Sequence, residues 1–191
     1  MKNSLSAEKG TYKYIDNRKR KYLFFSILSL LSVLVIFFTG VIIYHSNKSI
    51  FSIIAAVSTL PAAKIVISYI IIAPYNSGDS ESYEKLNEHA KKTNAELLCD
   101  MVITSETKAV FIQYAYIIDG KIYLYSNYKK FDKKFSEEYI RKILEENFNF
   151  SVLKIYLDKQ EFMNFVLQTS ALDSKKAMDG RIGKKLLSYS V

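Results

Sequence analysis

Cysteine, histidine and tryptophan are scarce in this chain of 191 residues, which has one cysteine, two histidines and no tryptophan. The lone Cys99 has no partner for a disulfide within the chain, which agrees with a reducing, cytosolic environment. The histidines, His45 and His89, are predicted below to lie on opposite sides of a membrane. This separation excludes a histidine-rich metal site.

Sequence motifs that identify common enzyme classes are also missing. The chain has no GxxxxGK[ST] phosphate loop, no GxGxxG dinucleotide loop and no Gly-x-Ser-x-Gly elbow. A catalytic Cys99 would need a histidine and an acid beside it, and only His89 is available, so we interpret Cys99 as an inert, half-buried thiol. We therefore expect no catalytic residue, no metal and no resident cofactor, and a protein that is not an enzyme.

Two long stretches, residues 22–44 and 50–73, contain no aspartate, glutamate or arginine, and their only lysine is Lys64. Each is long enough to cross a hydrocarbon core, which takes about 20 helical residues. The five residues between them, 45–49, leave room only for a turn. The sequence therefore predicts a membrane hairpin of two transmembrane helices, with small residues along both that allow close packing.

The positive charge of the chain, +8 overall, is concentrated at its N-terminus. Residues 1–21 carry seven basic and two acidic side chains (7 − 2 = +5), whereas residues 75–191 carry 18 basic and 17 acidic ones. The cluster Arg18, Lys19, Arg20 and Lys21 directly precedes the first stretch. Positive flanks stay in the cytoplasm, so both termini are predicted to be cytoplasmic, and the cluster is predicted to bind anionic lipid headgroups. The nearly neutral remainder argues against a nucleic acid partner.

Lys64 is predicted to lie close to the middle of the membrane. With a span of 50–73 it lies within about 4 Å of the midplane, and its side chain cannot reach a boundary about 15 Å away. Such a lysine needs a partner. The candidates are Ser29 and Ser32 at matching depth, the carbonyl group that Pro61 leaves without a donor, and a carboxylate of another protein. The alternative is a shifted span that places Lys64 nearer the cytoplasmic surface.

The remaining residues predict a small cytoplasmic domain, 81–191, after a polar linker at 74–80. Its fold class is α+β, with a mainly antiparallel sheet and flanking helices. Ser136 is predicted to cap the second helix and Asp158 the third. Residues 184–191 read as a short last strand or a frayed tail. The predicted helices are 82–94, 136–147 and 159–170, and the predicted strands are 97–105, 109–118, 121–127 and 151–157.

Asp119-Gly120 is a strong signal for a two-residue hairpin turn, which fixes the register of the two strands around it. Facing residues then have numbers that sum to 239, and this places four tyrosines on one face of the hairpin: Tyr114, Tyr116, Tyr123 and Tyr125. This face is either covered by a helix or available as an interaction face.

The order helix, three strands, helix, strand resembles the restriction-endonuclease-like core. That resemblance implies an acid on the second strand and an acid-x-Lys on the third, which together hold Mg²⁺. Asp119-Gly120-Lys121 has the spacing and Asp100 is a distant acid, but Asp119 lies in the turn and the second strand has no acid. A membrane-tethered nuclease-like enzyme is therefore the alternative function.

The apolar hairpin, the run Leu60-Pro-Ala-Ala-Lys64 and the lysine-rich small domain resemble small two-span membrane proteins of low-GC Gram-positive bacteria. The resemblance implies the same topology and a cell-membrane location, and it implies no activity. Our leading hypothesis is a membrane protein that anchors a small cytoplasmic interaction domain. Its partners would be membrane lipids and either another membrane protein or further copies of the chain. A third hypothesis is an accessory subunit of a transporter, with Lys64 on an ion or substrate path.

Overall fold

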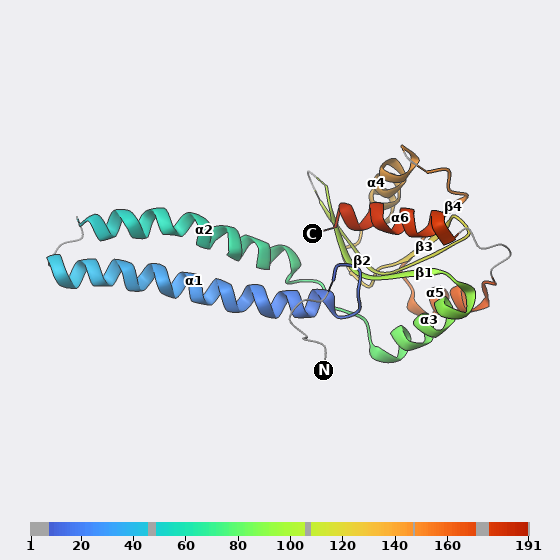
Figure 1. The fold of residues 1–191 in the computed structure, drawn as a ribbon, viewed down its shortest axis with the longest axis horizontal. Coiled ribbons are helices and arrows are strands. Elements are labelled where there is room, and N and C mark those ends of the chain that lie inside the picture. The colour runs from blue at the N-terminus through green and yellow to red at the C-terminus, as the bar shows by residue number, and fades with distance from the viewer. Residues whose placement is uncertain (1–7, 46–48, 106–107, 147, 171–175, 191) are drawn as a thin grey trace. The chain divides into compact units, whose positions relative to one another are not determined.

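The computed structural model describes residues 8–45, 49–105, 108–146, 148–170 and 176–190. The chain divides into two compact units. One is a helical hairpin that takes in Asp16–Pro74. The other is an α+β domain that takes in the chain up to Ile15 and again from Tyr75 onwards (Figure 1). Residues on both sides of the hairpin therefore build one domain.

The hairpin consists of α1, Tyr14–Tyr44, and α2, Ile50–Ile72. Both are long and apolar enough to cross a membrane. The predicted stretches lie almost entirely within these helices, but α1 begins eight residues before the first stretch, so the basic residues 18–21 are helical. Three residues of the predicted outer turn, 46–48, lie outside the described part of the chain, as do residues 1–7 of the basic N-terminus.

The α+β domain follows the predicted order of elements and adds one helix. Its strands are β1 Glu96–Thr104, β2 Ala109–Ile118, β3 Lys121–Tyr125 and β4 Val152–Tyr156. Its helices are α3 Ser80–Thr93, α4 Lys133–Glu145, α5 Lys159–Gln168 and α6 Lys176–Ser188. The added helix is α6, which occupies a region where the sequence suggests a strand or a tail.

The sheet has the strand order β1-β2-β3-β4, with β1, β2 and β3 antiparallel and β4 parallel to β3. The predicted hairpin register is confirmed, because Tyr114 faces Tyr125 and Tyr116 faces Tyr123. Both turn residues have positive φ, 50° at Asp119 and 71° at Gly120, as a turn of this kind requires.

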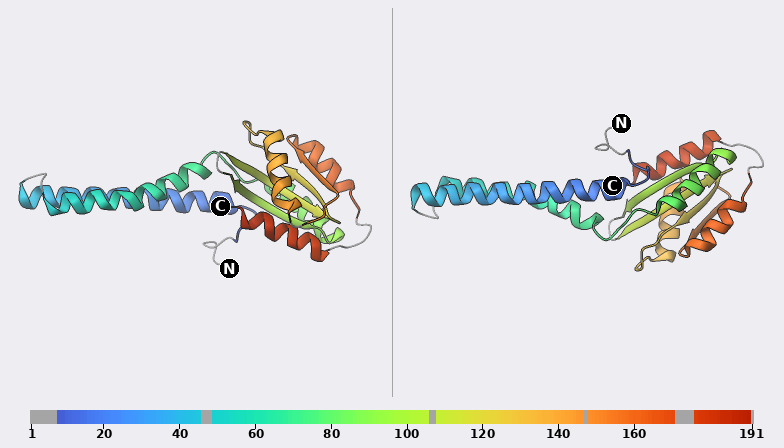
Figure 2. Two further views of the ribbon diagram at one scale, coloured as in Figure 1. Left: turned by 90° about the horizontal axis from the view of Figure 1, so that it is seen from above. Right: turned by 90° about the horizontal axis from the view of Figure 1, so that it is seen from below.

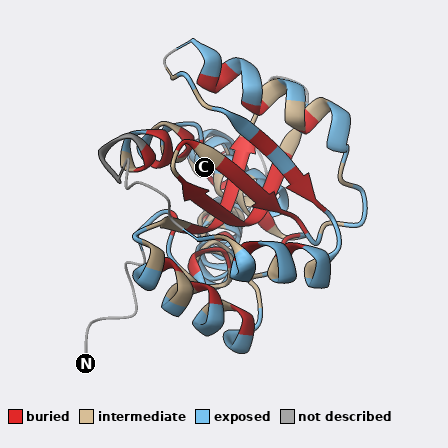
Figure 3. Cartoon of the chain, turned by 90° about the vertical axis from the view of Figure 1, so that its right-hand side faces the viewer, coloured by how far each residue is buried: buried red, intermediate tan, exposed pale blue. Residues whose placement is uncertain are grey.

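Helices cover both faces of the sheet and make a three-layer domain (Figures 1 and 2). On one face, α4 and α6 contribute Ile140, Ile143, Leu144, Ile182 and Leu186 to the larger core cluster. On the other face, α3 and α5 contribute Leu86, Ala90, Phe162 and Val166 to a second, tyrosine-rich cluster. Figure 3 shows the strands buried between helices whose outer surfaces are exposed.

The N-terminal caps of α3, α4 and α5 are aspartates. Asp158 accepts a hydrogen bond from the backbone N–H of Glu161 (2.7 Å), which confirms its predicted role at the start of α5. The prediction for α4 is wrong, because Asp132 caps that helix through the N–H of Phe135. Ser136 lies inside α4, where its hydroxyl donates to the carbonyl of Asp132 (2.6 Å). Aspartate and serine are comparably good N-caps. Asp132 caps α4 because the helix begins at Lys133, directly after it.

Two large apolar side chains of the domain, Leu157 and Phe165, are exposed. Leu157 is 48% exposed because β4 ends one residue earlier, at Tyr156. Phe165 of α5 is 40% exposed and lies over the outer edge of the tyrosine cluster, with its ring 4.9 Å from the ring of Tyr123.

Both β1 and β2 change their inward-facing side at one position, where Asp100 faces Gln113. Leu98 and Met101 share the larger core cluster although they are three residues apart, and so do Ile112 and Ala115. Residues an odd number of positions apart point to opposite faces of a regular strand. Each strand therefore has one irregular position here, beyond which its side chains change faces. Asp100 has a φ of 54°, and the pairing of β1 with β2 skips it. This irregularity is the place where the chain from α2 joins the sheet.

Candidate functional site

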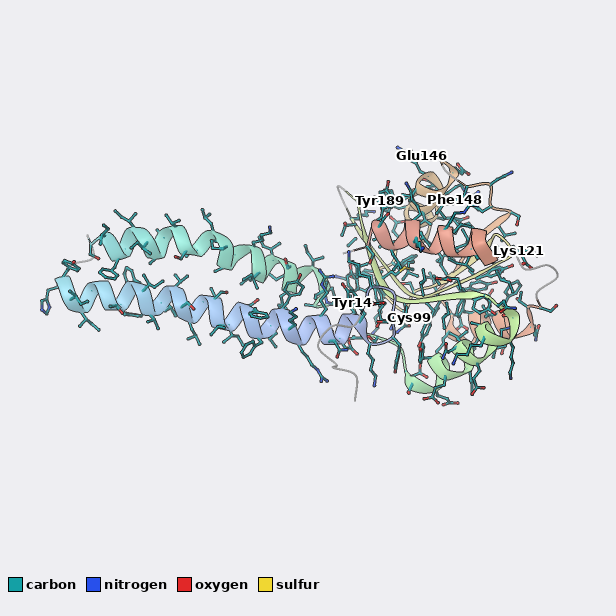
Figure 4. All side chains as sticks on the ribbon, viewed as in Figure 1. Tyr14, Cys99, Lys121, Glu146, Phe148 and Tyr189 are labelled. Atoms are coloured by element: carbon teal, nitrogen blue, oxygen red, sulfur yellow. The ribbon has the colours of Figure 1, made fainter. Side chains whose placement is uncertain are left out.

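The surface of the hairpin is the most unusual feature of the protein. Apolar side chains project from both helices along their length (Figure 4), and Ile42 and Leu60 are 70% and 73% exposed. Soluble monomers rarely expose contiguous apolar patches larger than a few hundred Å². This surface is therefore suited to an apolar environment.

Several of the buried residues of the hairpin are small. Ser26, Gly40, Ala55 and Ala62 are among the buried residues of the hairpin. A Cβ atom added to Gly40 would lie 2.4 Å from the Cβ of Phe51, so only glycine fits there. Gly40 therefore allows a close approach between α1 and α2 near the turn that joins them.

Lys64 lies three residues beyond the midpoint of α2, and its side chain is exposed. The predicted serine partners use their hydroxyls within α1: Ser29 donates to the carbonyl of Ser26 (3.0 Å) and Ser32 to that of Leu28 (2.8 Å). Pro61 lies inside α2, one turn before Lys64. Within the described ranges we find no hydrogen bond or ion pair of the Lys64 ammonium group.

The basic cluster at the start of α1 is not uniform. Lys19 donates a hydrogen bond to the carbonyl of Ala73, the C-cap residue of α2 (3.3 Å), where a positive charge also stabilises the end of the helix dipole. Arg18 donates to the hydroxyl of Tyr22 (3.0 Å) and lies over its ring. Arg20 and Lys21 are exposed. Half of the cluster thus has a structural task within the hairpin.

The segment after α2, residues 75–79, is bound to the domain at every residue. The ring of Tyr75 stacks on Phe111 of β2 (4.7 Å). The carbonyl of Asn76 accepts a hydrogen bond from the side chain of Gln113 (3.2 Å), and the Ser77 hydroxyl donates to the carboxylate of Asp100. This segment lies within the predicted polar linker, 74–80, and it packs on the domain.

Asp79 ends this segment and joins two helices of the domain. Its carboxylate accepts a hydrogen bond from the backbone N–H of Ser82, which caps α3, and forms an ion pair with Lys159 of α5. These two interactions hold the pKa of Asp79 well below its usual value, with Lys159 the larger cause.

The segment before α1 is bound to the same domain. The backbone N–H of Cys99 donates to the carbonyl of Gly10 (2.8 Å), and the ammonium group of Lys9 donates to the carbonyl of Ser190 (2.6 Å). Tyr12 stacks on Tyr83 of α3 with ring centres 4.3 Å apart. The chain upstream of α1 therefore covers the free edge of β1.

The two connecting segments also contact each other. The hydroxyl of Tyr12 donates to the carbonyl of Gly78 (3.1 Å). Gly78 in turn lies against Tyr114, and a Cβ atom added to it would come within 1.9 Å of the Tyr114 hydroxyl oxygen. The chain that enters the hairpin and the chain that leaves it are thus fastened to one another and to the sheet.

The four tyrosines of the β2–β3 hairpin are covered, so their interpretation as an interaction face is wrong. Tyr114, Tyr116, Tyr123 and Tyr125 are at most 5% exposed, beneath α3 and α5. The hydroxyl of Tyr116 contacts that of Thr93 on α3 (2.6 Å). Burial raises the pKa of all four tyrosines. The alternative interpretation, a helix-covered cluster, describes this face.

The two acids of the nuclease-like hypothesis are not brought together. Facing residues of β1 and β2 have numbers that sum to 213, as Glu96 and Ile117 do. Asp119 is therefore level with position 94, six residues from Asp100. At about 3.3 Å per strand residue the two acids are about 20 Å apart. No group of three metal-ligating side chains occurs among the described residues. The turn itself has a structural partner, because the carboxylate of Asp179 accepts hydrogen bonds from the N–H groups of Asp119 and Gly120 (both 2.9 Å).

Cys99 is a fully buried thiol, more enclosed than the half-buried state that the sequence suggests (Figure 4). Burial is the main reason why its pKa is raised, and the neighbouring Asp100 raises it further. We predict that Cys99 in the folded protein does not react with Ellman's reagent at pH 8, since the thiolate is the nucleophile. In denaturant one thiol per chain should react at the rate of a free thiol. Fast reaction without denaturant would show that β1 is accessible.

None of the family models, curated proteins or solved structures compared with this chain matches it.

Proposed function

We propose that this chain is an integral membrane protein whose hairpin holds a small, non-enzymatic interaction domain at the cytoplasmic face of the membrane. The observation that carries the proposal is the exposed apolar surface on both helices of the hairpin. Burying this surface in lipid removes it from water, at a gain of about 25 cal/mol per Å².

Alkaline carbonate extraction tests the membrane part of this proposal. The full chain should remain in the membrane fraction, as a protein held by two apolar helices does. Release into the soluble fraction would contradict the proposal, because peripheral proteins held by charge are released under these conditions.

The segments on both sides of the hairpin support a single folded domain as the part that the hairpin anchors. Segments 9–12 and 75–79 both make specific contacts with the sheet and its helices. The chain therefore enters the hairpin from the domain and returns to the same domain.

Lys64 favours a second membrane protein as the partner. A lysine near the centre of a transmembrane helix costs at least about 2.5–3.5 kcal/mol unless it is paired. Further copies of this chain offer no carboxylate at that depth, because neither apolar stretch contains an acidic residue. We therefore assign the counter-charge to an aspartate or glutamate in a membrane helix of a different protein.

We predict that Lys64→Leu abolishes the complex with that protein and leaves membrane insertion intact or improved, because the variant removes an unpaired charge. The measurement is purification of the tagged full chain in mild detergent, with co-purifying proteins identified by mass spectrometry. Lys64→Arg, which keeps the charge, and Ile67→Leu, a change at another exposed position of α2, are the matched controls. An unchanged set of partners in Lys64→Leu would make Lys64 a structural residue and remove its role in recognition.

A membrane-tethered, metal-dependent enzyme of the nuclease-like class is the second candidate. The order α3-β1-β2-β3-α4-β4 favours it, and the separation of Asp100 from Asp119 argues against it. This candidate requires Mg²⁺ to raise the melting temperature of the full chain and requires Asp119→Asn to remove that effect. We expect no Mg²⁺-dependent shift in either protein.

A further inference from the structure

Four exposed lysines surround the start of α4: Lys129, Lys130, Lys133 and Lys134. The one acidic residue among them, Asp132, is paired with Lys108 (2.7 Å) and accepts the capping hydrogen bond of α4. Within a domain whose charges nearly balance, this segment carries a local excess of positive charge. It lies on the side of the domain to which the chain from α2 is attached.

The attachment is through two tyrosine rings. Tyr128, which directly precedes the lysines, makes an edge contact with Tyr75 at a ring-centre distance of 5.1 Å. Tyr75 follows the last residue of α2, Ile72, by three positions, and three residues of chain span at most about 11 Å. If α2 crosses a membrane, this contact holds the lysine-bearing segment within reach of the lipid headgroups.

The backbone that bears the lysines is also held in place. The N–H of Phe131 donates to the carbonyl of Tyr128 (3.0 Å), and Phe131 and Phe135 pack against the larger core cluster. Apolar residues between the lysines therefore point inward while the lysines remain in solvent. Little ordering of the backbone is needed for the four ammonium groups to meet a charged surface together.

We propose that Lys129, Lys130, Lys133 and Lys134 form a surface that binds the anionic headgroups of the membrane in which the hairpin lies. The inference rests on the proposed membrane location. It gives the chain a second contact with the lipid besides the basic residues of α1. Each lysine near an anionic surface raises the binding constant roughly fivefold, so four lysines together have a large effect.

A nucleic acid would be attracted by the same charges, but the surroundings favour lipid. Single strands are bound through aromatic rings that stack on bases, and the aromatic rings of this segment, Phe131 and Phe135, are packed against the core instead. The contact between Tyr128 and Tyr75 also ties the segment to the chain that follows a candidate membrane helix.

The test uses the full chain in lipid nanodiscs and a fluorophore at Asn127→Cys, an exposed position beside the lysines. Labelling is selective because Cys99 is buried. Energy transfer from this fluorophore to a headgroup-labelled lipid is compared between phosphatidylcholine discs and discs that also contain phosphatidylglycerol. We expect higher transfer with phosphatidylglycerol, and loss of the increase at high salt.

Two quadruple variants separate this surface from general charge effects. K129Q/K130Q/K133Q/K134Q should lose the phosphatidylglycerol-dependent increase. K91Q/K92Q/K142Q/K184Q removes four exposed lysines elsewhere on the domain and should keep it. Equal transfer in both lipids, or an equal loss in both variants, would overturn the inference.

Two further outcomes are distinguishable from these. Failure of the chain to enter nanodiscs at all would overturn the proposed membrane location itself. A change in the fluorescence of this label on addition of a single-stranded RNA, lost in K129Q/K130Q/K133Q/K134Q and accompanied by no response to lipid, would overturn the lipid assignment in favour of nucleic acid.

Discussion

Gly78→Ala should destabilise the α+β domain more than a change to alanine at any other described glycine of that domain. The new Cβ atom would lie 1.9 Å from the hydroxyl oxygen of Tyr114 and 2.5 Å from its Cζ. Tyr114 has no room to move, because it is 1% exposed and its ring is stacked with those of Tyr125 and Phe162. The connecting segment must therefore shift.

The shift would break several interactions at once, since the hydrogen bonds of Ser77 with Asp100 and of Tyr12 with Gly78 both depend on this position. Overpacking of this kind costs about 1–3 kcal/mol, and the lost contacts add to it. The free energy of unfolding of the domain, measured by urea denaturation of the full chain in detergent, should fall by at least that amount.

Gly180→Ala is the matched control for this prediction. A Cβ atom there meets only a carboxylate oxygen of Glu96 at 4.0 Å, and the position is inside α6. Alanine should stabilise the helix by about 0.5–1 kcal/mol. If the two variants had the same stability, the close approach of Gly78 to Tyr114 would not exist in the folded protein.

Asp179→Ala should be nearly as damaging, at about 3 kcal/mol of unfolding free energy. The Asp179 carboxylate is 2% exposed and accepts two hydrogen bonds from the turn between β2 and β3. Alanine removes both charge-assisted bonds and leaves the buried N–H of Gly120 without its acceptor. Denaturation by urea measures the loss.

The conservative variant Asp179→Asn separates the hydrogen bonds from the charge. Asparagine keeps one acceptor oxygen and should retain part of the stability. Asp158→Ala, which removes an exposed helix cap, should cost only about 1 kcal/mol and provides the scale. A smaller loss in Asp179→Ala than in Asp158→Ala would contradict the role of Asp179 as the link between α6 and the turn.

Local signals predict the sheet well. Asp119-Gly120 determines the register of β2 and β3, because a two-residue turn leaves no freedom in pairing. Two apolar stretches whose only charged residue is Lys64 predict α1 and α2 for a similar reason, since composition alone distinguishes them from the rest of the chain.

The features that the sequence does not reveal depend on contacts between distant residues. The sequence around Gly10 and Tyr12 does not indicate that the chain before α1 covers β1. The partners of these two residues, Cys99 and Tyr83, are distant in sequence and are brought near only by the fold. The irregularity at Asp100 has no sequence signal either, because aspartate at positive φ is stabilised by its surroundings rather than by its neighbours in sequence.

Helix α6 is missed for a different reason. Gly180 and Gly183 lower its helix propensity, but Gly183 also brings α6 close to β1, since a Cβ atom there would lie 3.3 Å from side-chain atoms of Glu96 and Leu98. Close packing on β1 therefore outweighs the local preference. The same lesson applies to the candidate site: the contacts of segments 9–12 and 75–79 within the domain are recognisable only from the fold.

Sided labelling of single cysteines in intact cells tests the central claim most directly. His45→Cys directly follows the last residue of α1, and Asn127→Cys lies on the domain. A membrane-impermeant maleimide should label the first in intact cells and the second only after the membrane is opened. Labelling of both positions in intact cells, or of neither until the membrane is opened, would contradict a hairpin that crosses the membrane twice and holds its domain in the cytoplasm.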